Sequence, residues 1–343
     1  MDTISHPSRR TILAAGAMVG ASALSPALLH AQSRKYPVYG KVERLAPELD
    51  ALIDADAVVE EIMGGFTWSE GPLWIGGADG MLLASDPREN VISSWSDRAG
   101  GAPWMKPSGY AGEPTPRLRE PGSNGLFLGR GGLIMSDSGT RAIAHVDLKT
   151  KKKTIIVDRF EGKRFNSPND LCVSPRDKSI YFTDPPYGLT DGPKSPDREM
   201  DYTGVFRIAP DNSVTLVGKY QMPNGIGISP DGGTLYHTDG NLGWVAHTLD
   251  ANGNSISERP FIDRQAQNFT GNSGDGFRVD QDGNLWISGR DGISIVTSAG
   301  KRIGIIRLND VVSNCEIGAD GHLYMTSNKR LARVRVKARK LKV

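Results

Sequence analysis

The sequence predicts an all-β fold, a six-bladed β-propeller, and three observations support this prediction. The 343 residues include 41 glycines and 21 prolines, so turns interrupt the chain throughout and long amphipathic helices are hard to find. A pattern of apolar strand, tight turn and apolar return strand occurs six times. These units start about 40 to 55 residues apart, which is the length of one four-stranded sheet with its turns. Six such units are most simply closed into a ring.

The composition is that of a folded protein without a strongly charged partner. Hydrophobic residues make up 38% of the chain and charged residues 23%, which is enough to bury a core. The formal net charge is +2, so the overall balance does not favour a nucleic acid or a membrane surface as partner.

The first 31 residues are predicted to be a twin-arginine export signal. Arg9 and Arg10 precede an Ala- and Gly-rich run that continues to about Leu29, and Ala27 and Ala31 are alternative cleavage points. The export machinery is then a partner, and the mature protein is expected in the periplasm or outside the cell, with no stable membrane association after cleavage. The alternative is an uncleaved membrane anchor, for which the run is poorly suited because of Gly16, Gly20, Ser22, Ser25 and Pro26.

Residues 32–57 are interpreted as an N-terminal extension and residues 58–343 as the propeller. Glu48–Ile53 is expected to form a helical turn. Val58–Met63 near the start and Leu331–Val336 near the end both have strand patterns, and we expect them to share one blade and close the ring. A Pro- and Gly-rich excursion over residues 100–122 is expected to be a functional lid or an ordered surface loop.

Polar residues stand at the entrance of the first strand in each unit. In chain order they are Glu70, Asn124, Asn169, Asn224, Asp275 and Glu316. Because the innermost strand of every propeller blade starts near the axis, residues at the same phase converge in space. Four of these residues form a set of hard oxygen donors, namely Glu70, Asn169, Asn224 and Asp275. This set suits Ca²⁺, with Mg²⁺ or Mn²⁺ as lesser candidates, in a central metal-binding channel, and it argues against zinc or copper.

A turn role is the alternative for two members of this set. Asn224 and Asp275 each precede a glycine, and Asn or Asp before Gly is typical of tight turns. Glu70, which precedes Gly71 and Pro72, fits that explanation less well. The shared phase across the units favours a common site.

Four motifs at these positions resemble those of the gluconolactonase and senescence marker protein (regucalcin) family. They are SEGPLW, FNSPNDLCVSPRDKSIYFTDPPYG, MPNGIGISPDG and GDGFRVDQDGNLW, and they occur in the family's order. The resemblance implies a six-bladed propeller with a divalent ion, usually calcium, and lactone hydrolysis as the commonest activity. Carried over by motif, Glu70, Asn224 and Asp275 resemble the metal ligands, and Asp275 also resembles the proposed general base. Asn169 resembles an amide that contacts metal or substrate.

The implied chemistry is consistent with these side chains. A cation polarises the lactone carbonyl, and a neighbouring carboxylate takes the proton of the attacking water. Asp275 is the candidate catalytic residue, although its ligand and base roles compete. Asn124, Asn169 and Asp170 are the candidate substrate-binding residues, with a turn role equally open for Asn124 and an assisting role open for Asp170.

Other chemistries have weaker support. Cys172 and Cys315 lie in apolar strand-like runs, so two buried thiols are expected rather than one disulfide. No cysteine has a histidine at zinc-site spacing, and the chain contains no GxSxG elbow. We expect the histidines to be solvated or satisfied in the core, and we assign no substrate role to Arg164 because its spacing to Asn169 differs from that of the family.

The resulting hypothesis is an exported, metal-dependent hydrolase that converts a sugar lactone such as glucono-1,5-lactone to the aldonic acid. Hydrolysis of another ester or an organophosphate at the same ion is one alternative. A non-enzymatic propeller that binds a sugar or a partner is another.

Overall fold

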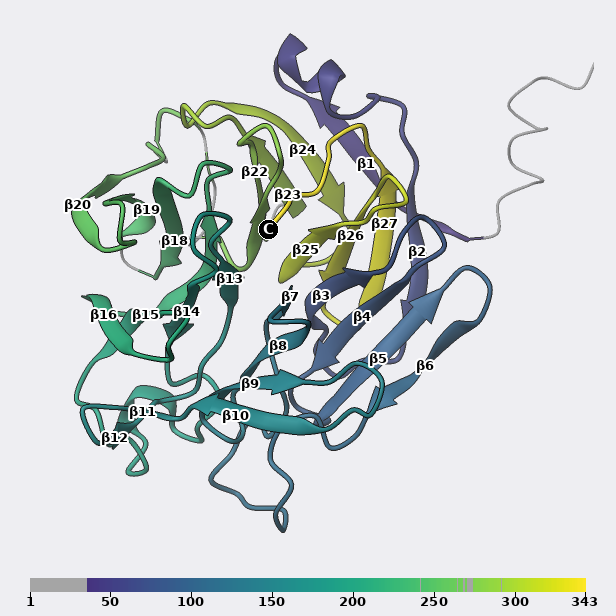
Figure 1. Cartoon of the computed structure of the whole chain (residues 1–343). Coiled ribbons are helices and arrows are strands. Elements are labelled where there is room, and N and C mark those ends of the chain that lie inside the picture. The colour runs from purple at the N-terminus through teal and green to yellow at the C-terminus, as the bar shows by residue number, and fades with distance from the viewer. Residues whose placement is uncertain (1–35, 241, 264, 268, 270–273, 291) are drawn as a thin grey trace, which may run out of the picture. The chain divides into compact units, whose positions relative to one another are not determined.

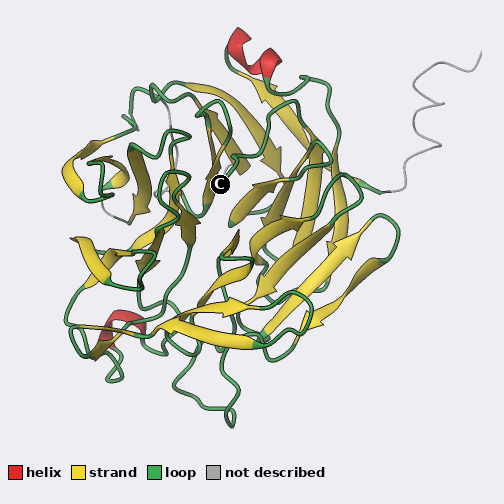
Figure 2. Cartoon of the chain, in the orientation of Figure 1, coloured by secondary structure: helices red, strands yellow, loops and turns green. Residues whose placement is uncertain are grey.

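The computed structural model describes residues 36–343, apart from positions 241, 264, 268, 270–273 and 291. The described residues form 27 strands and two short 3-10 helices, so the all-β prediction is confirmed (Figure 2). The helices are η1, Pro47–Ala51, which overlaps the helical turn predicted over Glu48–Ile53, and η2, Gly192–Lys194. Among the described residues, no helix has the length and apolar character needed to span a bilayer.

Four antiparallel sheets have four strands each, in chain order from the inner strand outward. The first contains β3 (Glu70–Ile75), β4 (Met81–Asp86), β5 (Val91–Ser96) and β6 (Gly100–Met105); the second contains β7 (Leu126–Gly129), β8 (Gly132–Asp137), β9 (Ala142–Val146) and β10 (Lys153–Val157). The third contains β13 (Leu171–Val173), β14 (Ile180–Asp184), β15 (Thr203–Ile208) and β16 (Val214–Tyr220); the fourth contains β17 (Pro223–Ile228), β18 (Thr234–Asp239), β19 (Gly243–Leu249) and β20 (Ser255–Pro260). A separate hairpin pairs β11 (Arg159–Phe160) with β12 (Lys163–Arg164).

A nine-stranded sheet contains two further four-stranded sets. One is β21 (Phe277–Val279), β22 (Leu285–Gly289), β23 (Gly292–Val296) and β24 (Arg302–Leu308); the other is β25 (Asn314–Ile317), β26 (His322–Ser327), β27 (Arg330–Arg335) and β2 (Val59–Gly64). Strand β1 (Val38–Arg44) pairs with both β24 and β2 and so joins the two sets.

The six sets are arranged in a ring around their first strands (Figure 1). Each first strand contacts the first strand of the next set in the order β3, β7, β13, β17, β21 and β25, and β25 in turn contacts β3. This cyclic order is the arrangement expected from six repeated units. Short first strands and closely spaced neighbours leave little room at the axis, so polar side chains from different sets meet there.

Pairing between the two ends of the described chain closes the ring. Strand β2 pairs antiparallel with β27, in a register that sets Val59 opposite Val334, as predicted for the shared blade. The structure adds one element that the sequence pattern did not indicate. Strand β1 falls inside the segment interpreted as an extension, yet it pairs with β24 over five successive residues, from Gly40 opposite Leu308 to Arg44 opposite Gly304. The predicted export signal, residues 1–31, lies outside the described residues.

The core consists of apolar clusters between neighbouring sheets. Phe165, Phe182 and Phe206 are fully buried, with ring centroids 5.1 to 5.4 Å apart. Burying such a ring stabilises the fold by roughly 1.5–3 kcal/mol relative to leaving it exposed. Cys172 and Cys315 are both free and buried, which confirms the prediction of two thiols.

The excursion over residues 100–122 is an ordered segment whose first part is strand β6. The rest is tied down by backbone hydrogen bonds, including Tyr110 N–H to the Pro121 carbonyl at 2.7 Å. Its far end forms an isolated bridge between Leu118 and Leu189. The segment is thus a strand followed by a hydrogen-bonded loop, and its role as a lid or as a surface loop stays a prediction.

Candidate active site

A cavity of about 230 Å³ opens at one end of the ring axis. It is lined by Trp68, Glu70, Arg88, Arg119, Glu120, Asn124, Asn169, Tyr187, Asn224 and Asp275. Five of the six predicted site residues are therefore together, although they come from five different sets of strands. Asp170 is the exception.

The five residues converge because each stands at the entrance of an inner strand. Glu70 begins β3, and Asn224 is the second residue of β17. Hydroxyl groups on the second strand of one set hold the entrance residue of the next set by its carbonyl oxygen. Ser85 donates to the Asn124 carbonyl at 2.8 Å, Thr183 to the Asn224 carbonyl at 2.6 Å and Thr238 to the Asp275 carbonyl at 3.2 Å. The backbone that carries the cavity side chains is thus fixed by a repeated hydrogen bond.

The glycines that follow Glu70 and Asn224 allow close packing at the axis. A Cβ atom added to Gly71 would lie 1.9 Å from the Asn124 carbonyl oxygen, and one added to Gly225 would lie 2.2 Å from the Asp275 carbonyl oxygen. No other residue fits such an approach between backbones. Asn224 lies within a strand and, like Asp275, lines the cavity, so the pairs Asn-Gly and Asp-Gly do not mark simple turns here.

The pKa values of two cavity carboxylates, Glu70 and Asp275, are raised. Burial, followed by the charge of Asp275, raises the pKa of Glu70 well above its usual range, although Trp68 Nε1–H donates to Glu70 Oε1 at 3.0 Å. Burial, followed by the charge of Asp170, raises the pKa of Asp275 to about 7, and a hydrogen bond from the Asn224 side chain opposes the shift. Like charges held together in a poorly solvated place favour a bound cation.

The donor chemistry fits a hard cation. Glu70 and Asp275 supply carboxylate oxygens, Asn169 and Asn224 supply amide oxygens, and neither thiolate nor imidazole lines the cavity. In the part of the chain that the structure describes, no group of three or more His, Cys, Asp or Glu side chains is placed to hold a metal ion. A cation in this cavity would therefore depend on the amides as well as on the two carboxylates. The assignment of the four residues as ligands stays a prediction.

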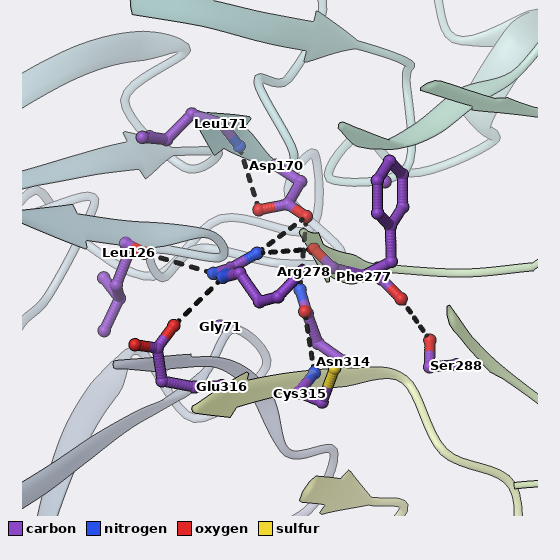
Figure 3. Close-up of polar contacts among 12 residues, drawn as sticks. Gly71, Leu126, Asp170, Leu171, Phe277, Arg278, Ser288, Asn314, Cys315 and Glu316 are labelled. Carbon is purple, nitrogen blue, oxygen red and sulfur yellow. Dashed lines mark hydrogen bonds and ion pairs between the residues drawn. The ribbon is translucent and has the colours of Figure 1, made fainter. Parts of the chain in front are cut away.

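Asp170 lies one layer deeper than the cavity and is 1% exposed. Its carboxylate accepts from Leu171 N–H at 2.9 Å and from Asn314 Nδ2–H at 3.3 Å, and it faces Arg278 Nη1 at 3.7 Å (Figure 3). This position suits orientation of the neighbouring Asn169, one of the two roles considered for Asp170. It does not place the carboxylate against a ligand in the cavity.

Arg278 fills the axis beneath the cavity and was not predicted as a site residue. Its guanidinium donates to Glu316 Oε2 at 3.1 Å and to the Phe277 carbonyl at 3.0 Å (Figure 3). Burial lowers the pKa of Arg278, but the charges of Asp170 and Glu316 outweigh this and the pKa is raised overall. Arg278 therefore stays charged and neutralises the carboxylates around it.

The placement of Glu316 at the sixth strand entrance is wrong. Glu316 lies three residues beyond Ser313, which is the residue before the inner strand, and it points away from the cavity of about 230 Å³. With Arg278 and the tail residue Lys340 it lines a second, much smaller cavity of about 30 Å³. Lys340 Nζ forms an ion pair with Glu316 Oε1, so the C-terminal segment covers this end of the axis.

Five cavity residues were missed by the sequence reasoning. Trp68 stands next to a quoted motif, and Tyr187 is within one, but neither has the repeat phase that identified the others. Arg119 and Glu120 come from the excursion, and their Cα positions are set by hydrogen bonds from both of their backbone N–H groups to the Gly188 carbonyl, at 2.9 and 3.1 Å. Burial raises the pKa of Tyr187, so its hydroxyl remains a donor. Arg88 follows β4 and lies over the Trp68 ring at 5.8 Å.

Arg164 and the histidines that the structure describes, for which the sequence predicts no site role, do not line the cavity. Arg164 Nη2–H donates to the Thr140 carbonyl at 2.8 Å and does not line the cavity. His237 and His247 contact each other through ring nitrogens 3.2 Å apart, and both are buried in one sheet. Burial lowers the pKa of His237 to about 3, which agrees with a neutral histidine in the core.

The chain is similar in sequence or fold to gluconolactonases and to a regucalcin. The family model described as SMP-30/Gluconolactonase/LRE-like region matches residues 68–329. The chain is 39% identical to a gluconolactonase of Zymomonas mobilis subsp. mobilis over 98% of this chain and 99% of that protein. A gluconolactonase structure from Xanthomonas campestris superposes with a TM-score of 0.75 at 28% identity, covering 89% of this chain and 99% of that one. A calcium-binding protein, regucalcin, from Agrobacterium tumefaciens has the same fold, with a TM-score of 0.60 at 17% identity over 82% of this chain and 98% of that one.

Proposed function

The chain belongs to the SMP-30/gluconolactonase/LRE-like family, and on this basis we propose that it hydrolyses a sugar lactone of the glucono-1,5-lactone type to the aldonic acid. The observation that carries the proposal is the convergence of Glu70, Asn124, Asn169, Asn224 and Asp275 on one cavity. Hydrolysis of a cyclic ester needs an activated water, a polarised carbonyl and groups that orient the ring hydroxyls. This cavity offers side chains for each of these tasks.

A divalent cation, most simply Ca²⁺, is part of the proposal. Glu70, Asn169, Asn224 and Asp275 would hold it, and when bound it would polarise the lactone carbonyl. The oxygen-only donor set and the raised pKa of both carboxylates support this choice. Mg²⁺ and Mn²⁺ take similar ligands and are compared in the same experiment.

The chain's own side chains bind and orient the substrate. Tyr187 keeps its proton and donates to a ring oxygen, and Asn124 and Asn169 donate or accept at sugar hydroxyls. The Trp68 ring forms an apolar wall of the cavity. Asp275 carries two proposed roles, ligand and proton acceptor. The two roles compete, because coordination to a cation lowers the basicity of the carboxylate.

The test is a pH-stat assay of the purified full chain with glucono-1,5-lactone, corrected for spontaneous hydrolysis. We expect turnover that is lost with chelator and restored by Ca²⁺, and weaker restoration by Mg²⁺ or Mn²⁺. Asp56→Asn, which changes an exposed carboxylate, serves as the control and should leave turnover unchanged. A rate equal to that of heat-treated protein across a panel of lactones, esters and organophosphates would refute the proposal.

We also propose export by the twin-arginine route and a periplasmic or secreted location. The support is the Arg9–Arg10 pair ahead of an Ala- and Gly-rich run. The test compares the location of the wild-type chain with that of a variant carrying Arg9→Lys and Arg10→Lys in a bacterial host. Retention of the variant inside the cell, with the wild type outside the inner membrane, is the expected result. Equal distribution of both would contradict it.

A further inference from the structure

Glu120 is a third carboxylate in the cavity, and it comes from outside the inner strands. It lies at the end of the excursion that precedes β7, whereas Glu70 and Asp275 stand at strand entrances. Its backbone is firmly placed, because Glu120 N–H and Arg119 N–H both donate to the Gly188 carbonyl. Gly188 follows Tyr187, so one backbone contact positions two cavity side chains, Glu120 and Tyr187.

The Glu120 side chain is buried but has little hydrogen bonding. It is 8% exposed. Within the described residues its hydrogen-bond partner is Arg119 Nη2, at 3.4 Å, which is near the outer limit for such a bond. The Arg119 side chain is 48% exposed, so this contact is weak. A carboxylate in this position normally accepts two or more hydrogen bonds, and burial without them costs free energy. The oxygens that face the cavity are therefore suited to a ligand.

The other two carboxylates of the cavity, Glu70 and Asp275, each accept two hydrogen bonds within the protein. Glu70 accepts from Trp68 Nε1–H at 3.0 Å and from Gly71 N–H at 3.4 Å. Asp275 accepts from the Asn224 side chain and from Gly276 N–H. Both also belong to the proposed ligand set. Glu120 does not, and its weak bond to Arg119 leaves lone pairs that can accept a proton from water.

We propose that Glu120 is the catalytic residue that takes the proton from the attacking water, which leaves Asp275 as a ligand. This inference rests on the proposed function. The water oxygen forms a bond to the lactone carbonyl carbon while its proton passes to the Glu120 carboxylate. The ring C–O bond then breaks, and Glu120 returns the proton to the departing ring oxygen. Lactone and water are converted to the hydroxy acid, and the glutamate is regenerated.

The charges around Glu120 are mixed. Arg119 and Arg88 face it from the excursion and from the turn after β4, and the carboxylates Glu70 and Asp275 face it across the cavity. Burial raises the pKa of Glu120, and the two arginines oppose this. Activity should therefore fall on the acid side at a pH above the pKa of an ordinary glutamate, about 4.3.

The experiment compares Glu120→Gln, Asp275→Asn and the control Glu113→Gln in the full chain. Glu113 lies in the same excursion and is exposed. Three quantities are measured for each variant: kcat and KM for glucono-1,5-lactone from pH 4.5 to 8, the calcium dissociation constant by calorimetry, and the thermal midpoint. Glu120→Gln should lower kcat about 100-fold or more and remove the acid limb of the pH profile, while its calcium affinity stays within about threefold of wild type. Asp275→Asn should weaken calcium binding about tenfold or more.

A second variant covers the case in which Glu120→Gln folds poorly. Glu120→Ala should regain part of its kcat on addition of formate, which supplies a carboxylate that a purely structural role would not need. The inference is overturned if Glu120→Gln keeps a third or more of kcat with the same acid limb, or if it loses calcium as Asp275→Asn does. It is also overturned if formate leaves Glu120→Ala unchanged. Absence of lactone hydrolysis in the wild-type chain would instead refute the proposed function.

Discussion

The two ends of the ring axis use the same six inner strands in opposite ways. At one end, Glu70 and Asp275 line an open cavity and repel each other. At the other end, Arg278, three residues after Asp275, lies between Asp170 and Glu316, and Lys340 forms an ion pair with Glu316. In the first layer the like charges of Glu70 and Asp275 face each other, whereas in the second layer Asp170 and Glu316 are paired with cations. We infer that the first layer is shaped for a ligand and the second for stability.

Replacing Arg278 tests the paired layer and should have the largest effect. Arg278→Met keeps much of the side-chain volume but leaves Asp170 and Glu316 buried without their cation. We expect a loss of about 3–5 kcal/mol in the free energy of unfolding, measured by urea denaturation. Arg333→Met, which removes a cation from β27, the third strand of its set, is the comparison and should cost less. Equal losses would show that the axis has no special role.

Replacing Asp275 tests the unpaired layer. Asp275→Asn should lower kcat/KM about 100-fold, equivalent to about 2.7 kcal/mol, because a ligand of the proposed cation is lost. The urea midpoint of the chelated protein should not fall, since the change removes a repelled carboxylate. A large loss of stability with little loss of activity would reverse the distinction between the two layers.

The pH dependence of stability sharpens the same contrast. The folded-state pKa of Asp275, about 7, lies above the value of an unfolded aspartate, about 3.9. Its contribution is therefore fully present below about pH 4 and is lost as the pH rises through about 7. With chelator present, wild type should lose about 3 kcal/mol more than Asp275→Asn between pH 4.5 and 7.5. Asp184, whose pKa burial also raises to about 7, is common to both proteins and cancels in this difference.

The control for this pH experiment is added calcium. A bound cation should abolish most of the difference between wild type and Asp275→Asn, because it lowers the pKa of the carboxylate that it contacts. Urea midpoints at both pH values, with and without calcium, check this. A difference that is the same in all four conditions would exclude Asp275 as its source.

Lys340 should give the smallest effect. Its side chain is 31% exposed, so Lys340→Met is expected to cost about 0.5–1 kcal/mol in urea denaturation. Because Lys340 contacts Glu316 and the Trp74 carbonyl and does not line the cavity, KM for the lactone should not change. A raised KM would mean that the two ends of the axis are coupled through Arg278.

The sequence predicted the ring because turn and strand patterns are local and repeated. The strands predicted at Val58–Met63 and Leu331–Val336 correspond, within one residue at each end, to β2 and β27. Strand β1 was missed because Val38–Arg44 mixes polar and apolar residues, and its pairing with β24 is decided by closure of the ring. The sixth unit was placed out of phase because Ser313 occupies the position where earlier units have an acid or an amide, and Glu316 was the nearest acid.

Some residues of the candidate site could be predicted from the sequence and others could not. Residues at strand entrances have a phase, so Glu70, Asn224 and Asp275 were found from the sequence. Glu120 and Tyr187 come from loops, where no repeat relates one residue to another, and they reach the cavity through contacts between distant segments. Arg278 was the one missed residue with a plain signal, because a charge inside the buried strand FRV requires a partner.

Strand β1 also sets a limit on which N-terminal residues the fold can lose. The seam between β24 and β2 is held by backbone hydrogen bonds from Val38 onward, and its two flanking strands present free edges if β1 is removed. Cleavage at either point of the predicted export signal, after Ala27 or Ala31, would leave this seam intact. Loss of residues through Arg44 would expose two strand edges to pairing with other chains.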